Sequence, residues 1–85
     1  MIEQVVVFSR QGCKYCEKSK EQLERNKLDF KMVTLEDDYN GDKVSFRAAI
    51  EEKVPVDVTF STLPQIFIGK RYIGGYDQLA LFIGE

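Results

Sequence analysis

Short apolar blocks alternate with amphipathic stretches along this chain, and the pattern predicts an α/β protein. Residues 5–8 are a continuous run of Val and Phe, which is typical of a buried strand. After a turn at residues 9–12, the polar, helix-favouring stretch 13–26 predicts an amphipathic helix, and residues 30–35 predict a second strand. One face of the first helix is expected to carry Cys16, Ser19, Lys20 and Leu23.

A second helix is predicted over residues 43–53. Asn40-Gly41-Asp42 offers turn and capping chemistry in front of it, and Pro55 ends it. The acidic run 36–38, which precedes this turn, is expected to be a solvated loop, and we assign it no function. The buried side of the helix is expected to carry Val44 and Ala48, with Phe46 and Ile50 beside them.

The last third of the chain predicts a loop, a hairpin and a final helix. Residues 65–68 and 71–73 favour two strands joined tightly through Gly69-Lys70, which is a hairpin signal. The element order is therefore β-α-β-α-β-β-α, with a mixed four-stranded sheet and three helices in one domain spanning residues 1–85. The expected loop is residues 56–62, the chain break is Gly74-Gly75, and the final helix is residues 76–83.

Composition narrows the function classes. Apolar residues make up 44% of the 85 positions, which is enough for a compact core. The net charge of −2 argues against a broad nucleic-acid surface. No apolar run has the length of a membrane span, and the opening residues lack the basic start and apolar stretch of a signal peptide. We therefore expect a cytoplasmic protein.

The two cysteines, Cys13 and Cys16, are separated by only two residues. A bridge between them closes a very small loop, so it would contribute little as a structural staple. The pair therefore indicates redox or metal chemistry. Zinc prefers four ligands, and the chain has no His and no third Cys, so a closed metal site would need a second chain or carboxylates. Cys16 could also be a core cysteine, because free Cys packs like a small apolar residue.

Cys13 falls at the predicted start of the first helix, and that position favours a reactive thiolate. The unpaired N–H groups and the positive dipole end of a helix lower the pKa of a cysteine there. Arg10 and Lys14 add positive potential. Cys16 lies one turn further along the helix, where it can attack a mixed disulfide on Cys13. One residue attacks and the other resolves.

Three separated motifs resemble the glutaredoxin family over nearly the whole chain. They are Cys13-Lys14-Tyr15-Cys16, Thr62-Leu63-Pro64-Gln65-Ile66-Phe67-Ile68 and Tyr72-Ile73-Gly74-Gly75-Tyr76-Asp77. The resemblance implies a thioredoxin fold, which agrees with the element order above. It also implies a monomeric enzyme with no tightly bound cofactor and no metal, which uses glutathione as its reducing co-substrate.

The resemblance assigns roles to individual residues. Cys13 and Cys16 resemble the catalytic nucleophile and the resolving thiol. Pro64 resembles a cis-proline that faces them, with Leu63 presenting its backbone to the cysteinyl part of glutathione. Arg10 is placed near a glutathione carboxylate, although alone it is an ordinary turn residue. The other implied glutathione contacts are Tyr15, Gly75, Tyr76 and Asp77. Of these, Gly75, Tyr76 and Asp77 match the turn and helix start that hold the γ-glutamyl carboxylate. Tyr15 and Tyr76 could instead be surface aromatics, and Gly74-Gly75 could simply end a strand.

Two residues depart from the family pattern. Lys14 stands where the commonest dithiol motif has proline, and Gln78 stands where many members have an acid that meets the γ-glutamyl amine. The first affects redox tuning, and the second is expected to weaken glutathione binding.

The function implied is glutathione-dependent reduction of protein disulfides and glutathione mixed disulfides, with ribonucleotide reductase a possible protein substrate. One alternative is a thioredoxin-like donor that thioredoxin reductase reduces. The other is a dimeric metal or iron–sulfur module held by Cys13 and Cys16.

Overall fold

The computed structural model describes residues 4–84, which contain a mixed four-stranded sheet with strand order β2-β1-β3-β4. The β1 strand is parallel to β2 and antiparallel to β3, and β3 is antiparallel to β4. The mixed sheet and the hairpin of β3 and β4 were predicted. The two central strands are short and largely buried, in keeping with their apolar sequences. The strands are β1 (Val5–Ser9), β2 (Phe30–Thr34), β3 (Gln65–Ile68) and β4 (Arg71–Gly74).

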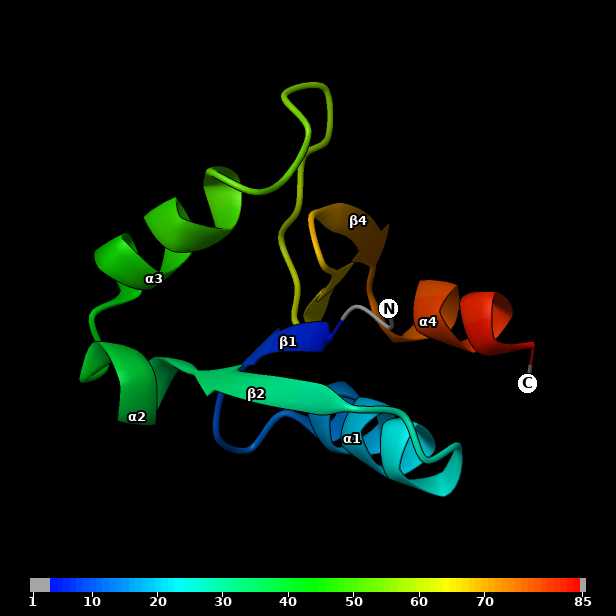
Figure 1. The fold of residues 1–85 in the computed structure, drawn as a ribbon. Coiled ribbons are helices and arrows are strands. Elements are labelled where there is room, and N and C mark those ends of the chain that lie inside the picture. Colours follow the sequence, from blue (N-terminus) through cyan, green and yellow to red (C-terminus); the bar gives the residue numbers. More distant parts are fainter. Residues whose placement is uncertain (1–3, 85) are drawn as a thin grey trace.

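Helices cover both faces of this sheet (Figure 1). The helices of the described residues are α1 (Lys14–Arg25), α2 (Leu35–Tyr39), α3 (Lys43–Glu51) and α4 (Tyr76–Ile83). Helices α1 and α4 lie against one another on one face, and α2 and α3 lie together on the other. None of them has the length and apolar character needed to cross a bilayer.

Alternation along the two central strands divides the core between the two faces. Neighbouring side chains of a strand point to opposite faces, so Val7 and Phe8 enter different cores. Ile66 and Phe67 divide in the same way on β3. The α1–α4 core is completed by Val5, Leu23 and Leu79, and the α3 core by Leu35, Phe46, Ile50 and Val54.

The described residues form four helices, so the prediction of three helices was wrong. The acidic run predicted as a loop is helical in α2, and Leu35 begins this helix rather than ending β2. Asp38 accepts the Thr34 N–H at 2.8 Å, and negative charge in the first turn complements the positive end of a helix. Leu35 is also buried in the α3 core, which ties this short helix to the sheet.

Helix α3 begins as predicted, since Asp42 Oδ1 accepts the Val44 and Ser45 N–H groups at 3.1 and 3.2 Å. A hydrogen bond from the Ser45 hydroxyl, together with these two from backbone N–H groups, lowers the pKa of Asp42. Phe46 is buried, as expected, but Val44 is 81% exposed, so its predicted burial was wrong. Burying the Phe46 face removes more apolar surface from water than burying the Val44 face would.

Ala48 lies four residues after Val44 on the same face of α3 and is exposed as well, against the prediction. Ile50, four residues after Phe46, is 1% exposed. The helix therefore buries the face of Phe46 and Ile50 in the core and leaves the face of Val44 and Ala48 in solvent.

Candidate functional site

Cys13 is the residue that caps the N-terminus of α1. Its backbone is extended, and its Sγ accepts the Cys16 N–H at 3.2 Å. Cys13 and Cys16 form a disulfide with 5.2 Å between their Cα atoms. Cys16 is only 1% exposed whereas Cys13 is half-buried, so an incoming disulfide or thiol reaches Cys13 first. The geometry fits the predicted division into an attacking and a resolving cysteine.

The loop in front of Cys13 is held by helix α2. The Gln11 N–H donates to Glu36 Oε1 at 2.9 Å across 25 positions of sequence. Gly12 follows with a φ of +73°, a conformation that favours glycine and turns the chain into α1. The acidic run 36–38, to which no function was assigned from sequence, therefore supplies a contact that fixes the loop leading to Cys13.

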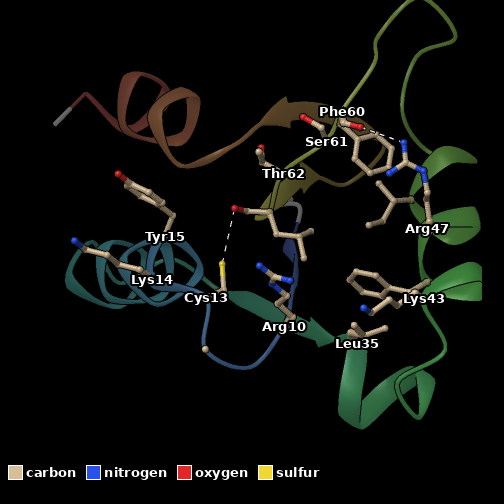
Figure 2. Close-up of a pocket in the computed structure, with 14 residues that line it drawn as sticks. Arg10, Cys13, Lys14, Tyr15, Leu35, Lys43, Arg47, Phe60, Ser61 and Thr62 are labelled. Carbon is tan, nitrogen blue, oxygen red and sulfur yellow. Dashed lines mark hydrogen bonds between the residues drawn. The ribbon is translucent and has the colours of Figure 1, made fainter.

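Pro64 lies opposite the cysteines, and its peptide bond with Leu63 is cis, as the resemblance implied. The Leu63 carbonyl oxygen is 3.8 Å from Cys13 Sγ (dashed in Figure 2). A side-chain network supports this segment, in which Gln65 Nε2 donates to the Thr62 carbonyl at 2.7 Å and Tyr72 Oη donates to Gln65 Oε1 at 2.6 Å. Burial raises the pKa of Tyr72, which favours the protonated hydroxyl that donates this hydrogen bond.

A pocket of about 580 Å³ opens beside Cys13 (Figure 2). Arg10, Lys14 and Lys43 line it, and among residues 4–84 none of the three has an ion-pair partner. Leu63 and Tyr15 also line this pocket, whereas Cys16 does not. The pocket therefore combines a sulfur, three cations without ion-pair partners and an apolar floor, which suits a ligand with a thiol and a carboxylate.

Arg47 and Phe60 form a wall of this pocket that was not predicted. The guanidinium of Arg47 lies 4.6 Å from the centre of the Phe60 ring and donates to the Phe60 carbonyl at 3.2 Å. It also pairs with Glu51 at 3.0 Å. The spacing of Lys43 and Arg47, four residues apart on a predicted helix, was the one sequence signal that both cations share a face. Phe60 carried no signal, because it lies in a predicted loop.

The remaining predicted contacts lie on the other side of Cys13, at the start of α4. The Tyr15 and Tyr76 rings are 5.8 Å apart at their centres, and Lys18 Nζ is 5.3 Å from the Tyr15 ring. The N–H groups of Tyr76 and Asp77, the first two of the helix, have no hydrogen-bond acceptor among the described residues. The Gly75 N–H differs, because Gln78 Oε1 accepts it at 2.9 Å.

No group of three or more Cys, Asp or Glu side chains within residues 4–84 is arranged to hold a metal ion.

Comparison with known proteins identifies the family. A model of the family described as Glutaredoxin matches residues 5–73. Glutaredoxin 1 of Escherichia coli is 33% identical over 88 residues, covering 96% of this chain and 94% of that protein. The crystal structure of glutaredoxin 1 from Francisella tularensis, complexed with cacodylate, superposes with a TM-score of 0.77 at 30% identity, covering 95% of this chain and 92% of that one.

A second solved structure is the buckwheat glutaredoxin–glutathione complex. It has a TM-score of 0.72 and 28% identity, and covers 94% of this chain and 69% of that one. The shared architecture is the thioredoxin fold, and it places the Cys13–Cys16 pair at the start of a helix opposite a cis-proline. This chain belongs to the glutaredoxin family of thiol–disulfide oxidoreductases.

Proposed function

We propose that this chain uses glutathione to reduce protein disulfides and glutathione mixed disulfides through Cys13 and Cys16. The observation that carries the proposal is the pocket in which Cys13 lies beside Arg10 and Lys43, two cations without ion-pair partners. Glutathione has one thiol and two carboxylates. Its thiol would meet Cys13 while one carboxylate faces these cations.

The opposite end of glutathione would lie towards α4. The unpaired N–H groups of Tyr76 and Asp77 suit its second carboxylate, because they lie at the positive end of a helix. Tyr15 and Tyr76 would flank the ligand between the two ends. A glutaredoxin with the same fold has been solved with glutathione, which supports this choice of thiol.

The reaction begins with reduced protein. The Cys13 thiolate attacks one sulfur of the substrate disulfide, and the other sulfur leaves as a thiolate that takes up a proton. Cys16 loses its proton and attacks Cys13 Sγ, which releases the second substrate thiol and forms the Cys13–Cys16 disulfide seen here. The Cys16 N–H directed at Cys13 Sγ stabilises negative charge on that sulfur, both as nucleophile and as leaving group.

Two molecules of glutathione complete the cycle. The first attacks Cys13 Sγ as a thiolate, which breaks the protein disulfide and leaves Cys13 joined to glutathione. The second attacks the glutathione sulfur of this mixed disulfide, so that oxidised glutathione leaves and the Cys13 thiolate returns. Electrons pass from two glutathione thiols to one substrate disulfide.

NADPH consumption tests the proposal when glutathione and glutathione reductase are compared with thioredoxin reductase alone. We expect turnover with the glutathione system. Cys13→Ser should abolish all exchange, whereas Cys16→Ser should lose reduction of protein disulfides and keep removal of glutathione from a mixed disulfide. Turnover with thioredoxin reductase but not with the glutathione system, or substantial activity of Cys13→Ser, would contradict the proposal.

The cation pocket is tested by Lys43→Gln, which removes charge and keeps a polar side chain. We expect the apparent KM for glutathione to rise about two- to fivefold, as for one solvent-exposed ion pair. Lys70→Gln is the matched control, because Lys70 lies in the turn at the far end of β3 from Pro64. Equal KM values for the two variants would show that Lys43 does not meet the ligand.

A further inference from the structure

Gln78 has its side chain folded back onto the turn that precedes α4. Its Oε1 accepts the Gly75 N–H at 2.9 Å. Its aliphatic carbons lie against Gly74, where an added Cβ would come within 2.9 Å of Gln78 Cγ. Gly74 has a φ of +121°, which few other residues adopt. The Gln78 side chain therefore fills the space beside Gly74 and Gly75 and accepts the N–H of Gly75.

This turn also lies against the segment that faces the cysteines. A Cβ built at Gly75 would be 3.6 Å from the Pro64 carbonyl oxygen, and the carbonyl of the preceding Leu63 is the one 3.8 Å from Cys13 Sγ. Gln78 and Gly75 also line, with Thr62, a groove of about 370 Å³ on this side of the molecule. The position of Gly75 is thus shared between the start of α4 and the wall of the redox site.

We propose that Gln78 is a positioning residue for glutathione: its carbonyl holds the Gly74–Gly75 turn and is therefore not a ligand group. The assignment rests on the function proposed above. It changes the expectation from sequence, in which Gln78 offers a weak neutral contact to the γ-glutamyl ammonium. Because the Gly75 N–H is already paired, the ligand carboxylate is left with N–H groups further into the helix, beginning with those of Tyr76 and Asp77.

The same geometry identifies the group left for the ammonium. The Asp77 carboxylate is exposed, and it has no hydrogen bond or ion pair within the described part of the chain. Asp77 follows the first residue of α4, one position before Gln78. Recognition at this end of glutathione is therefore divided, with Gln78 shaping the turn and Asp77 supplying the charge.

Three variants of Gln78 test the proposal by changing its hydrogen-bond acceptor, its charge and the length of its side chain separately. Gln78→Met keeps the length and packing of the side chain and removes the acceptor. Gln78→Glu keeps an acceptor at the same reach, and Gln78→Asn keeps an amide that is one methylene too short. Gln4→Met is the matched control, since Gln4 is exposed and its side chain makes no hydrogen bond among the described residues.

The measurements are the apparent KM and kcat for glutathione, and hydrogen exchange of the Gly75 amide in the absence of glutathione. We expect Gln78→Met and Gln78→Asn to raise KM about three- to tenfold, to change kcat less than KM, and to speed Gly75 exchange. Gln78→Glu should keep KM at or below the wild-type value with Gly75 protected. Gln4→Met should match wild type.

Each other result has a separate meaning. Faster Gly75 exchange with unchanged KM in Gln78→Met and Gln78→Asn would reduce Gln78 to a helix cap and overturn the inference. Unchanged Gly75 exchange with a raised KM would make Gln78 a direct ligand, which also overturns it. A wild-type protein that glutathione fails to reduce would overturn the proposed function itself. If Gln78→Met does not fold, Gln78→Asn and Gln78→Glu decide the question between them.

Discussion

The hydrogen bond from Tyr72 to Gln65 supports the segment opposite Cys13, and Tyr72→Phe removes it without changing the ring. Gln65 is 3% exposed, so its Oε1 loses its hydrogen-bond partner in a buried position. An unsatisfied buried acceptor costs about 1–3 kcal/mol of stability. The groove of about 370 Å³ that Tyr72 and Gln65 line lets water reach the edge of this site. We therefore expect a loss in the lower half of that range, about 1–2 kcal/mol.

Urea unfolding measures this loss directly, and thermal unfolding should show it as about 4–8 °C per kcal/mol for a chain of this size. Tyr39→Phe is the control, because Tyr39 packs its ring on Phe46 at 5.4 Å but its hydroxyl has no hydrogen bond among residues 4–84. A Tyr72→Phe loss no larger than that of the control would refute the reasoning.

The pH dependence gives an independent check on the same hydrogen bond. The pKa of Tyr72 is raised above 10.0 by burial, so the folded state favours the protonated hydroxyl. Its contribution to stability is therefore complete below pH 10 and is lost as the pH rises through the raised value. Wild-type protein should lose more stability than Tyr72→Phe across this alkaline range, and equal losses would contradict the assignment.

Substitutions at three further residues test the surroundings of Cys13 and the cap of α3. Lys14→Gln should raise the Cys13 pKa and make the pair less oxidising by at most about 30 mV, measured against glutathione redox buffers; an unchanged or lower pKa would contradict this. Glu36→Ala releases the Gln11 N–H, and we expect it to slow alkylation of the Cys13 thiolate, measured at high pH, about two- to tenfold. Glu36→Gln keeps a hydrogen-bond acceptor for Gln11 and should keep the wild-type alkylation rate. Equal alkylation rates in the two variants would refute the role of Glu36 in holding the loop. Asp42→Asn keeps the cap but removes the charge. Because hydrogen bonds lower the Asp42 pKa below 3.8, wild type should lose thermal stability on acidification through this range more than the variant, and parallel melting curves would exclude the effect.

Local pattern determined the elements that carry the chemistry. Residues 5–8 are apolar and β-branched, which suits a central strand, and residues 14–25 hold few apolar side chains, which suits a helix with one buried face. The Cys13-Lys14-Tyr15-Cys16 motif at the start of that helix could be predicted without knowledge of any tertiary contact. These features depend only on neighbours within a few residues, so the sequence alone was enough for them.

The other features of the fold depend on which face of a helix packs on the sheet and on contacts between residues far apart in the chain. The α3 sequence offers two apolar faces, and only packing on Phe8 and Phe67 selected Phe46 over Val44. Helix α2 forms because Leu35 reaches the same core, which a short acidic run does not reveal.

The functional surroundings of Cys13 likewise depend on residues far apart in the chain. Glu36 reaches Gln11 across 25 positions, and Arg47 reaches Phe60 across 13. Such contacts depend on how the sheet and helices are placed in space, and no spacing along the chain encodes them. The sequence therefore determined which atoms react, whereas the tertiary structure decided which side chains hold and surround them.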